Sequence, residues 1–67
     1  MELDRAIQEA FEDFALSVED IILHVKPATA FCRTVIRRHG APLSNEVILE
    51  RLLDLDQRGE LPLIVSL

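Results

Sequence analysis

One stretch decides the fold of this 67-residue chain: SNEVILERLLDLDQRG, residues 44–59. Ser44 is a good helix N-cap, Glu46 falls in the first turn, and Gly59 follows the last turn, so a helix is predicted over about residues 45–58. Apolar side chains occupy nearly every side of this helix: Val47, Ile48, Leu49, Leu52, Leu53 and Leu55. A helix this apolar is expected in the middle of the packing.

A second helix is predicted just upstream, over residues 28–39. Its apolar face consists of Ala28, Phe31, Cys32, Val35 and Ile36. Gly40 is well placed as a left-handed C-terminal cap, and residues 41–43 form a tight connection to Ser44.

Residues 2 to about 25 carry a helical stripe of apolar residues, which Lys26-Pro27 is expected to end. Leu16 and Leu23 lie on the opposite, acidic side. Three interpretations remain open. The helix runs through and buries both leucines in a second apolar contact, or it breaks near Ser17, which caps a new helix, or residues 21–25 form a strand because they are rich in β-branched side chains.

The last seven residues, Leu61-Pro62-Leu63-Ile64-Val65-Ser66-Leu67, read as an apolar β-strand. Pro62 has no N–H group, which places it at a sheet edge or at the start of the strand. Because the unpaired backbone groups of a lone strand are costly to bury, this strand needs a partner in the chain, in a second copy or in another protein.

Composition points to a single small domain, residues 1–67, that associates. Apolar residues make up 49% of the chain, yet a domain of this size buries only about 60% of the surface of its unfolded chain. A homo-oligomer would cover the surplus. With one cysteine, no signal peptide and no apolar run near the ~18 residues of a membrane span, we expect a cytoplasmic protein without membrane contact.

Charge is arranged in blocks along the chain. Residues 1–25 carry seven acids and one arginine, a net of −6, and residues 26–40 carry four cations and no acid, a net of +4. Residues 41–67 carry five acids and two arginines, a net of −3. The basic helix is therefore expected to pair with acidic helices in its own molecule or across a dimer, and nucleic acid is a poor partner for a chain of net charge −5.

No residues are spaced for catalysis or metal binding. His24, Cys32 and His39 form no Cys-x-x-Cys or His-x-x-x-His pair. No nucleophile and base are placed together, and both glycines are explained by helix ends. We therefore expect neither an enzyme nor a bound cofactor or metal.

The fold class predicted is mainly α: three helices in a small bundle with a C-terminal β-strand, completed by dimerisation. The function predicted is that of a small, non-catalytic protein–protein interaction module, a homodimer or an accessory or regulatory subunit. The expected partner-binding residues are Leu16, Leu23, Leu49, Leu53, Leu63, Val65, Arg33 and Arg37.

The rival interpretation is a DNA-binding transcriptional regulator. The order helix, short extended piece, helix, helix, strand resembles the winged-helix architecture, and residues 47–61 look like its third helix, a glycine turn and the first wing strand. Two features depart from that pattern. The would-be recognition helix carries Glu46, Glu50 and Asp54, which repel phosphates, and a second wing strand is missing. If the fold is winged-helix-like, we expect a version used for protein contacts.

Overall fold

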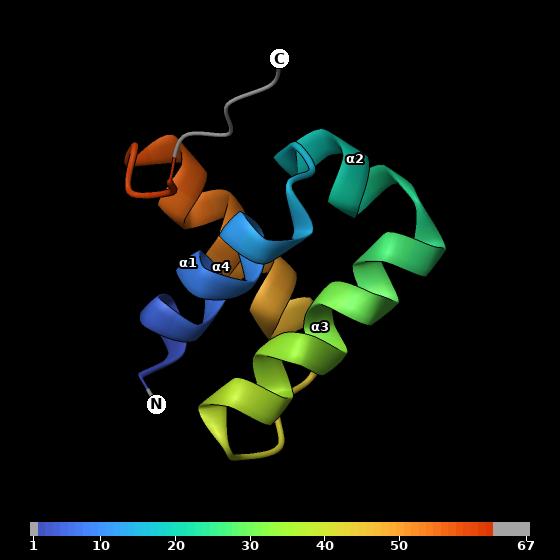
Figure 1. The fold of residues 1–67 in the computed structure, drawn as a ribbon, viewed down its shortest axis with the longest axis vertical. Helices are drawn as coiled ribbons and strands as arrows, with labels where there is room; N and C mark the ends of the chain where they lie inside the picture. Colours follow the sequence, from blue (N-terminus) through green and yellow to red (C-terminus); the bar gives the residue numbers. More distant parts are fainter. Residues whose placement is uncertain (1, 63–67) are drawn as a thin grey trace.

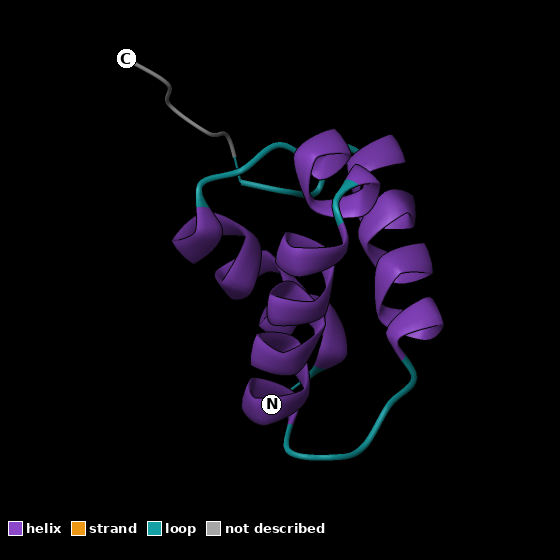
Figure 2. Ribbon diagram, turned by 90° about the vertical axis from the view of Figure 1, so that its right-hand side faces the viewer, coloured by secondary structure: helices purple, strands orange, loops and turns teal. Residues whose placement is uncertain are grey.

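The structure is a computed structural model that describes residues 2–62, and these residues form four helices. Their bounds are α1 (Leu3–Phe14), α2 (Val18–Leu23), α3 (Val25–His39) and α4 (Asn45–Gln57). Both α3 and α4 pack against every other helix, while α2 crosses one end of the molecule (Figure 1). Loops alone join the helices, and no strand is present within residues 2–62 (Figure 2).

The first helix does not run through to residue 25, so that interpretation was wrong. Ala15 adopts a left-handed conformation, with φ 53° and ψ 33°, and its N–H group donates to the carbonyl of Phe11 at 3.3 Å. Ser17 then caps α2, because its hydroxyl accepts a hydrogen bond of 3.1 Å from the amide of Asp20. The side chain of Ser17 thus supplies the acceptor that starts a new helix, as the second interpretation required.

The strand proposed for residues 21–25 is also absent, and Lys26-Pro27 does not end a helix. His24 is extended, with φ −120° and ψ 127°, and it separates α2 from α3. Pro27 lies in the first turn of α3, where its missing N–H group leaves no helical hydrogen bond unmade. The second predicted helix therefore exists but begins at Val25, three positions earlier than expected.

The predicted C-terminal end of α3 and both predicted ends of α4 are confirmed. Gly40 caps α3 with φ 85°, and its N–H group donates to the carbonyl of Ile36 at 2.9 Å. Ser44 caps α4, because its hydroxyl accepts from the amide of Val47 at 3.3 Å. Gly59 has φ 70° and follows the end of α4.

One contiguous core joins the four helices. It consists of Ala6, Ile7, Ala10, Phe11, Val18, Ile21, Phe31, Cys32, Val35, Ile48, Leu52 and Leu55. Phe14 packs edge to face against Phe31 of this core, with ring centroids 5.6 Å apart. The helix α4 buries only one side in this core, and its Val47 and Leu53 remain 44% and 41% exposed. The prediction that this helix is central is therefore right for one side and wrong for the other.

The predicted C-terminal strand finds no support in the described residues. Leu61 and Pro62 lie in a loop, and the rest of the predicted strand, Leu63 and Val65 included, lies outside the described residues. The chain before them is tied back to the bundle, because the side-chain amide of Gln8 donates to the carbonyl of Glu60 at 2.8 Å.

Candidate protein-binding groove

The end of the molecule formed by α2 and the start of α3 exposes large apolar side chains. Leu23 is 74% exposed and Val25 is 83% exposed. The predicted burial of Leu23 was therefore wrong. The break before Ser17 sets α2 so that Ile21 points into the core, and Leu23, about 200° further round the helix, points outward. Leu16 is half-buried and packs against the core.

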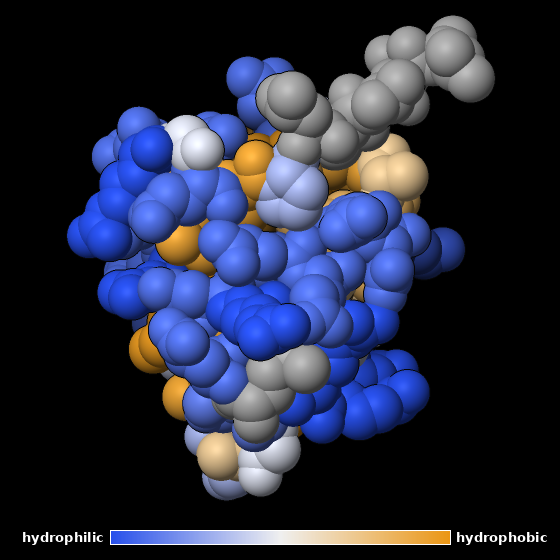
Figure 3. Space-filling model, turned by 60° about the vertical axis from the view of Figure 1, so that its left-hand side comes forward, coloured by the Kyte–Doolittle hydropathy of each residue, from blue (hydrophilic) through white to orange (hydrophobic). Residues whose placement is uncertain are grey.

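A groove of about 500 Å³ runs along the surface where α2 meets α4. It is lined by Val18, Glu19, Ile22, Leu23, Leu53 and Asp56, and we call it the α2–α4 groove. A second hollow of about 440 Å³ continues it past the ends of both helices, towards Leu61 and Pro62. Figure 3 shows one face of the molecule as mainly hydrophilic, with apolar atoms at the surface near the top of the view and along its left edge.

The charged residues that line the groove are both acidic. Glu19 enters from the first turn of α2, and Asp56 enters from the last turn of α4. Neither carboxylate forms an ion pair within residues 2–62. The groove therefore combines apolar walls with two negative charges that are not neutralised in the described part of the chain.

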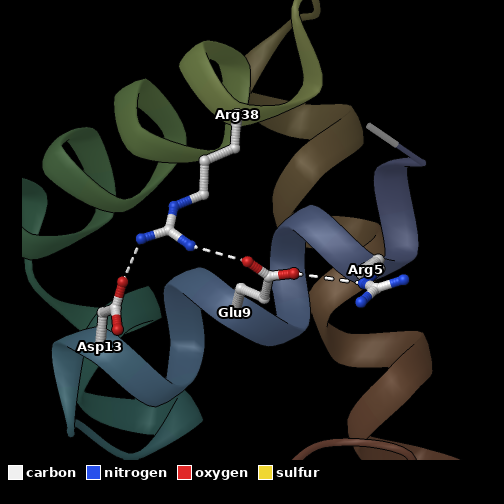
Figure 4. A network of polar contacts seen from close by, with 4 residues as sticks. All are labelled: Arg5, Glu9, Asp13 and Arg38. Carbon is white, nitrogen blue, oxygen red and sulfur yellow. Dashed lines mark hydrogen bonds and ion pairs between the residues drawn. The ribbon is translucent and has the colours of Figure 1, made fainter.

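Ion pairs elsewhere hold the helices together. Arg38 on α3 reaches Glu9 at 3.1 Å and also Asp13, and Glu9 in turn accepts from Arg5 at 3.3 Å (Figure 4). This network confirms that a basic side chain of α3 pairs with the acidic first helix inside one molecule.

A second ion pair ties α4 to α1. Arg51 donates to both carboxylate oxygens of Asp4, at 2.5 and 3.0 Å. This hydrogen-bonded guanidinium holds the pKa of Asp4 below its usual value.

The remaining cations of α3 form a separate surface. Lys26, Arg33 and Arg37 are all exposed and have no ion-pair partner among residues 2–62. They lie seven and four positions apart, so they follow one side of the helix. We call these three residues the basic stripe.

The structure brings some of the sequence-predicted residues together and separates others. Leu23 and Leu53 share the groove, whereas Leu49 packs against the core. Arg33 and Arg37 belong to the basic stripe and do not line the groove.

Sequence reasoning missed several lining residues of the groove, namely Val18, Glu19, Ile22 and Asp56. One signal pointed to them: Ser17 followed by Asp20 three positions later, the pattern of a helix N-terminus. A helix that begins there separates residues 18–23 from the apolar stripe of the first helix.

The side chains that could bind a metal ion do not cluster in the described part of the chain. Cys32 is buried, its sulfur lies 3.8 Å from the carbonyl oxygen of Asn45, and burial raises the pKa of the thiol. Within residues 2–62, no three His, Cys, Asp or Glu side chains gather as a metal site would require. None of the described helices has both the length and the apolar run needed to cross a bilayer.

The chain was compared with protein-family models, with curated proteins and with solved structures, and none of the three comparisons found a match.

Proposed function

We propose that this chain is a small, non-catalytic protein–protein interaction module that binds another polypeptide through the α2–α4 groove. It would act as a homodimer or as an accessory or regulatory subunit, and the single thiol, Cys32, suits a reducing compartment such as the cytoplasm. The observation that carries the proposal is the exposure of Leu23 and Leu53 on the two walls of one apolar groove.

Single exposed leucines are common on protein surfaces, but apolar side chains gathered around a concave site mark an interaction surface. Complete burial of one leucine by a partner contributes roughly 1.5–3 kcal/mol. A partner that buries Leu23, Leu53 and the neighbouring Ile22 would therefore gain binding free energy from apolar surface that is exposed in the isolated chain.

The alternative function, a DNA-binding regulator, rests on the basic stripe. Lys26, Arg33 and Arg37 face solvent on one side of α3, as phosphate-binding side chains would. Against this, α4 exposes Glu46 and Glu50, and the described residues contain no strand that could serve as a wing. The interaction module is therefore the better supported of the two proposals.

The proposal is tested by amide NMR spectra of the labelled chain, recorded at increasing concentrations of unlabelled chain and, separately, of a Leu- and Lys-containing amphipathic peptide. We expect resonances of Val18, Ile22 and Leu53 to shift in at least one titration. Leu53→Ser should abolish the shifts. Val47→Ser is the matched control, because Val47 is equally exposed on α4 and does not line the groove.

Two results would contradict the proposal. One is the absence of localised shifts in both titrations. The other is an equal effect of Leu53→Ser and Val47→Ser, which would show that the groove has no special role in binding.

A further inference from the structure

We propose that the occupant of the α2–α4 groove is a second copy of this chain, and that Lys26 of each copy lies against Glu19 and Asp56 of the other. This inference rests on the proposed function and names its partner. It starts from one projecting feature, the corner at His24 between α2 and α3, which we call the α2–α3 corner (residues 23–26).

The α2–α3 corner is shaped to enter an apolar site. Leu23 and Val25, the most exposed large apolar side chains of residues 2–62, stand on either side of His24. The backbone of His24 is extended, and its Nδ1 lies 3.0 Å from the carbonyl oxygen of Asp20. This contact holds the ring against α2 and leaves both apolar side chains projecting.

Charge decides which occupant fits the groove. Glu19 and Asp56 are its charged lining residues, and both are acidic, so the occupant should bring a cation next to its apolar side chains. The α2–α3 corner does so, because Lys26 directly follows Val25 and begins the basic stripe. Of the seven basic side chains of the chain, four form ion pairs in the described structure, and Lys26 is not one of these four.

The α2–α3 corner and the α2–α4 groove lie next to each other, so two copies can make the same contact in both directions. Leu23 belongs both to the groove wall and to the corner, so the two features are adjacent on one surface. A two-fold dimer requires a self-complementary patch of this kind, in which residue i of one copy meets residue j of the other and residue j meets residue i. Two such patches can therefore meet around Leu23, each corner entering the groove of the opposite copy.

The decisive experiment is a charge exchange followed by sedimentation equilibrium of the full chain. Lys26→Glu should raise the dissociation constant of the dimer at least about tenfold, and so should the double variant Glu19→Lys/Asp56→Lys. An equimolar mixture of the two variants should dimerise again. In the mixed dimer one half of the interface keeps its native charges, and the other half has both signs exchanged.

Matched variants control for net charge and folding. Glu12→Lys/Glu50→Lys makes the same charge change at exposed positions that do not line the groove, and it should dimerise no more weakly than the wild-type chain. Circular dichroism checks that each variant is helical. If the double lysine variant is unfolded, Glu19→Gln/Asp56→Asn removes both charges and should still weaken the dimer measurably.

Three outcomes would overturn the inference: a chain that stays monomeric at high micromolar concentration, a Lys26→Glu variant that dimerises like the wild-type chain, or two folded variants whose mixture does not dimerise. If the chain is monomeric and the amphipathic peptide still shifts the groove resonances, a different protein is the occupant and the proposed function stands. Dimerisation only in the presence of duplex DNA would likewise exclude this interface.

Discussion

Leu23, at the end of α2, and Leu53, in the second half of α4, line the same groove although they are distant in the sequence. Both remain substantially exposed in the single chain. Leu23 therefore has little to contribute to the folding of the monomer, and both side chains keep apolar surface that a partner could bury. Stability and association should respond differently to their substitution.

Leu23→Ala should change the free energy of unfolding by no more than the ~0.5 kcal/mol typical of surface sites, because its side chain is 74% exposed. Leu52→Ala should cost about 2–5 kcal/mol, because Leu52 is fully buried and its truncation leaves a cavity. Urea unfolding at low protein concentration measures both values. A loss near 2 kcal/mol for Leu23→Ala would show that this side chain is buried after all.

Ala15→Gly should raise the free energy of unfolding by about 0.5–1 kcal/mol. Glycine adopts the positive φ of this helix end without the steric cost that alanine bears, and that gain exceeds the entropy that glycine loses on folding. Ala30→Gly, in the exposed middle of α3, is the control and should cost about 1 kcal/mol. Equal destabilisation by the two substitutions would contradict the break at Ala15.

Acid should weaken the tie between α1 and α4. The hydrogen-bonded Arg51 lowers the pKa of Asp4 in the folded chain, so the stabilisation is present above the unfolded-state pKa of about 4 and is lost as the pH falls through the lower folded-state value. Urea midpoints measured from neutral to acidic pH should therefore fall less steeply for Asp4→Asn than for the wild-type chain. An unchanged curve for Asp4→Asn would contradict the pairing.

Arg33→Ala/Arg37→Ala should alter folding stability by only tenths of a kcal/mol, because both side chains are exposed and without ion-pair partners in the described structure. Arg38→Ala, which removes the bridge to Glu9 and Asp13, should be more destabilising. In a gel-shift assay at ~0.15 M salt, neither the wild-type chain nor the double variant should retain duplex DNA at sub-micromolar concentration. Binding by the wild-type chain alone would favour the DNA-binding function.

Local signals in the sequence were sufficient for some elements of the fold. Ser44, Gly40 and Gly59 mark helix ends through chemistry that acts within four residues, so their roles could be predicted without knowledge of the packing. The break before Ser17 was harder to predict, because alanine carries no signal for a left-handed conformation. Pro27 was misleading, since the same residue that ends one helix also suits the first turn of the next.

The groove could be predicted only in part. Leu53 belongs to a helix with apolar residues on nearly every side, and the sequence does not show which of those sides other helices cover. Leu23 was predicted to lie away from the main apolar stripe, and the structure places it on the groove wall. Its predicted burial was wrong because α2 was not separated from α1. Glu19 and Asp56 looked like ordinary solvent-facing acids until the fold placed them on the two sides of one groove.

The most direct test of the groove as a self-association site is sedimentation equilibrium of the intact chain from low to high micromolar concentration at ~0.15 M salt, where exposed charges more than about 8 Å apart are largely screened. The average mass should rise from that of one chain to that of two, and Lys26→Glu should move this transition to higher concentration. A mass of one chain at every concentration would contradict pairing through the α2–α4 groove.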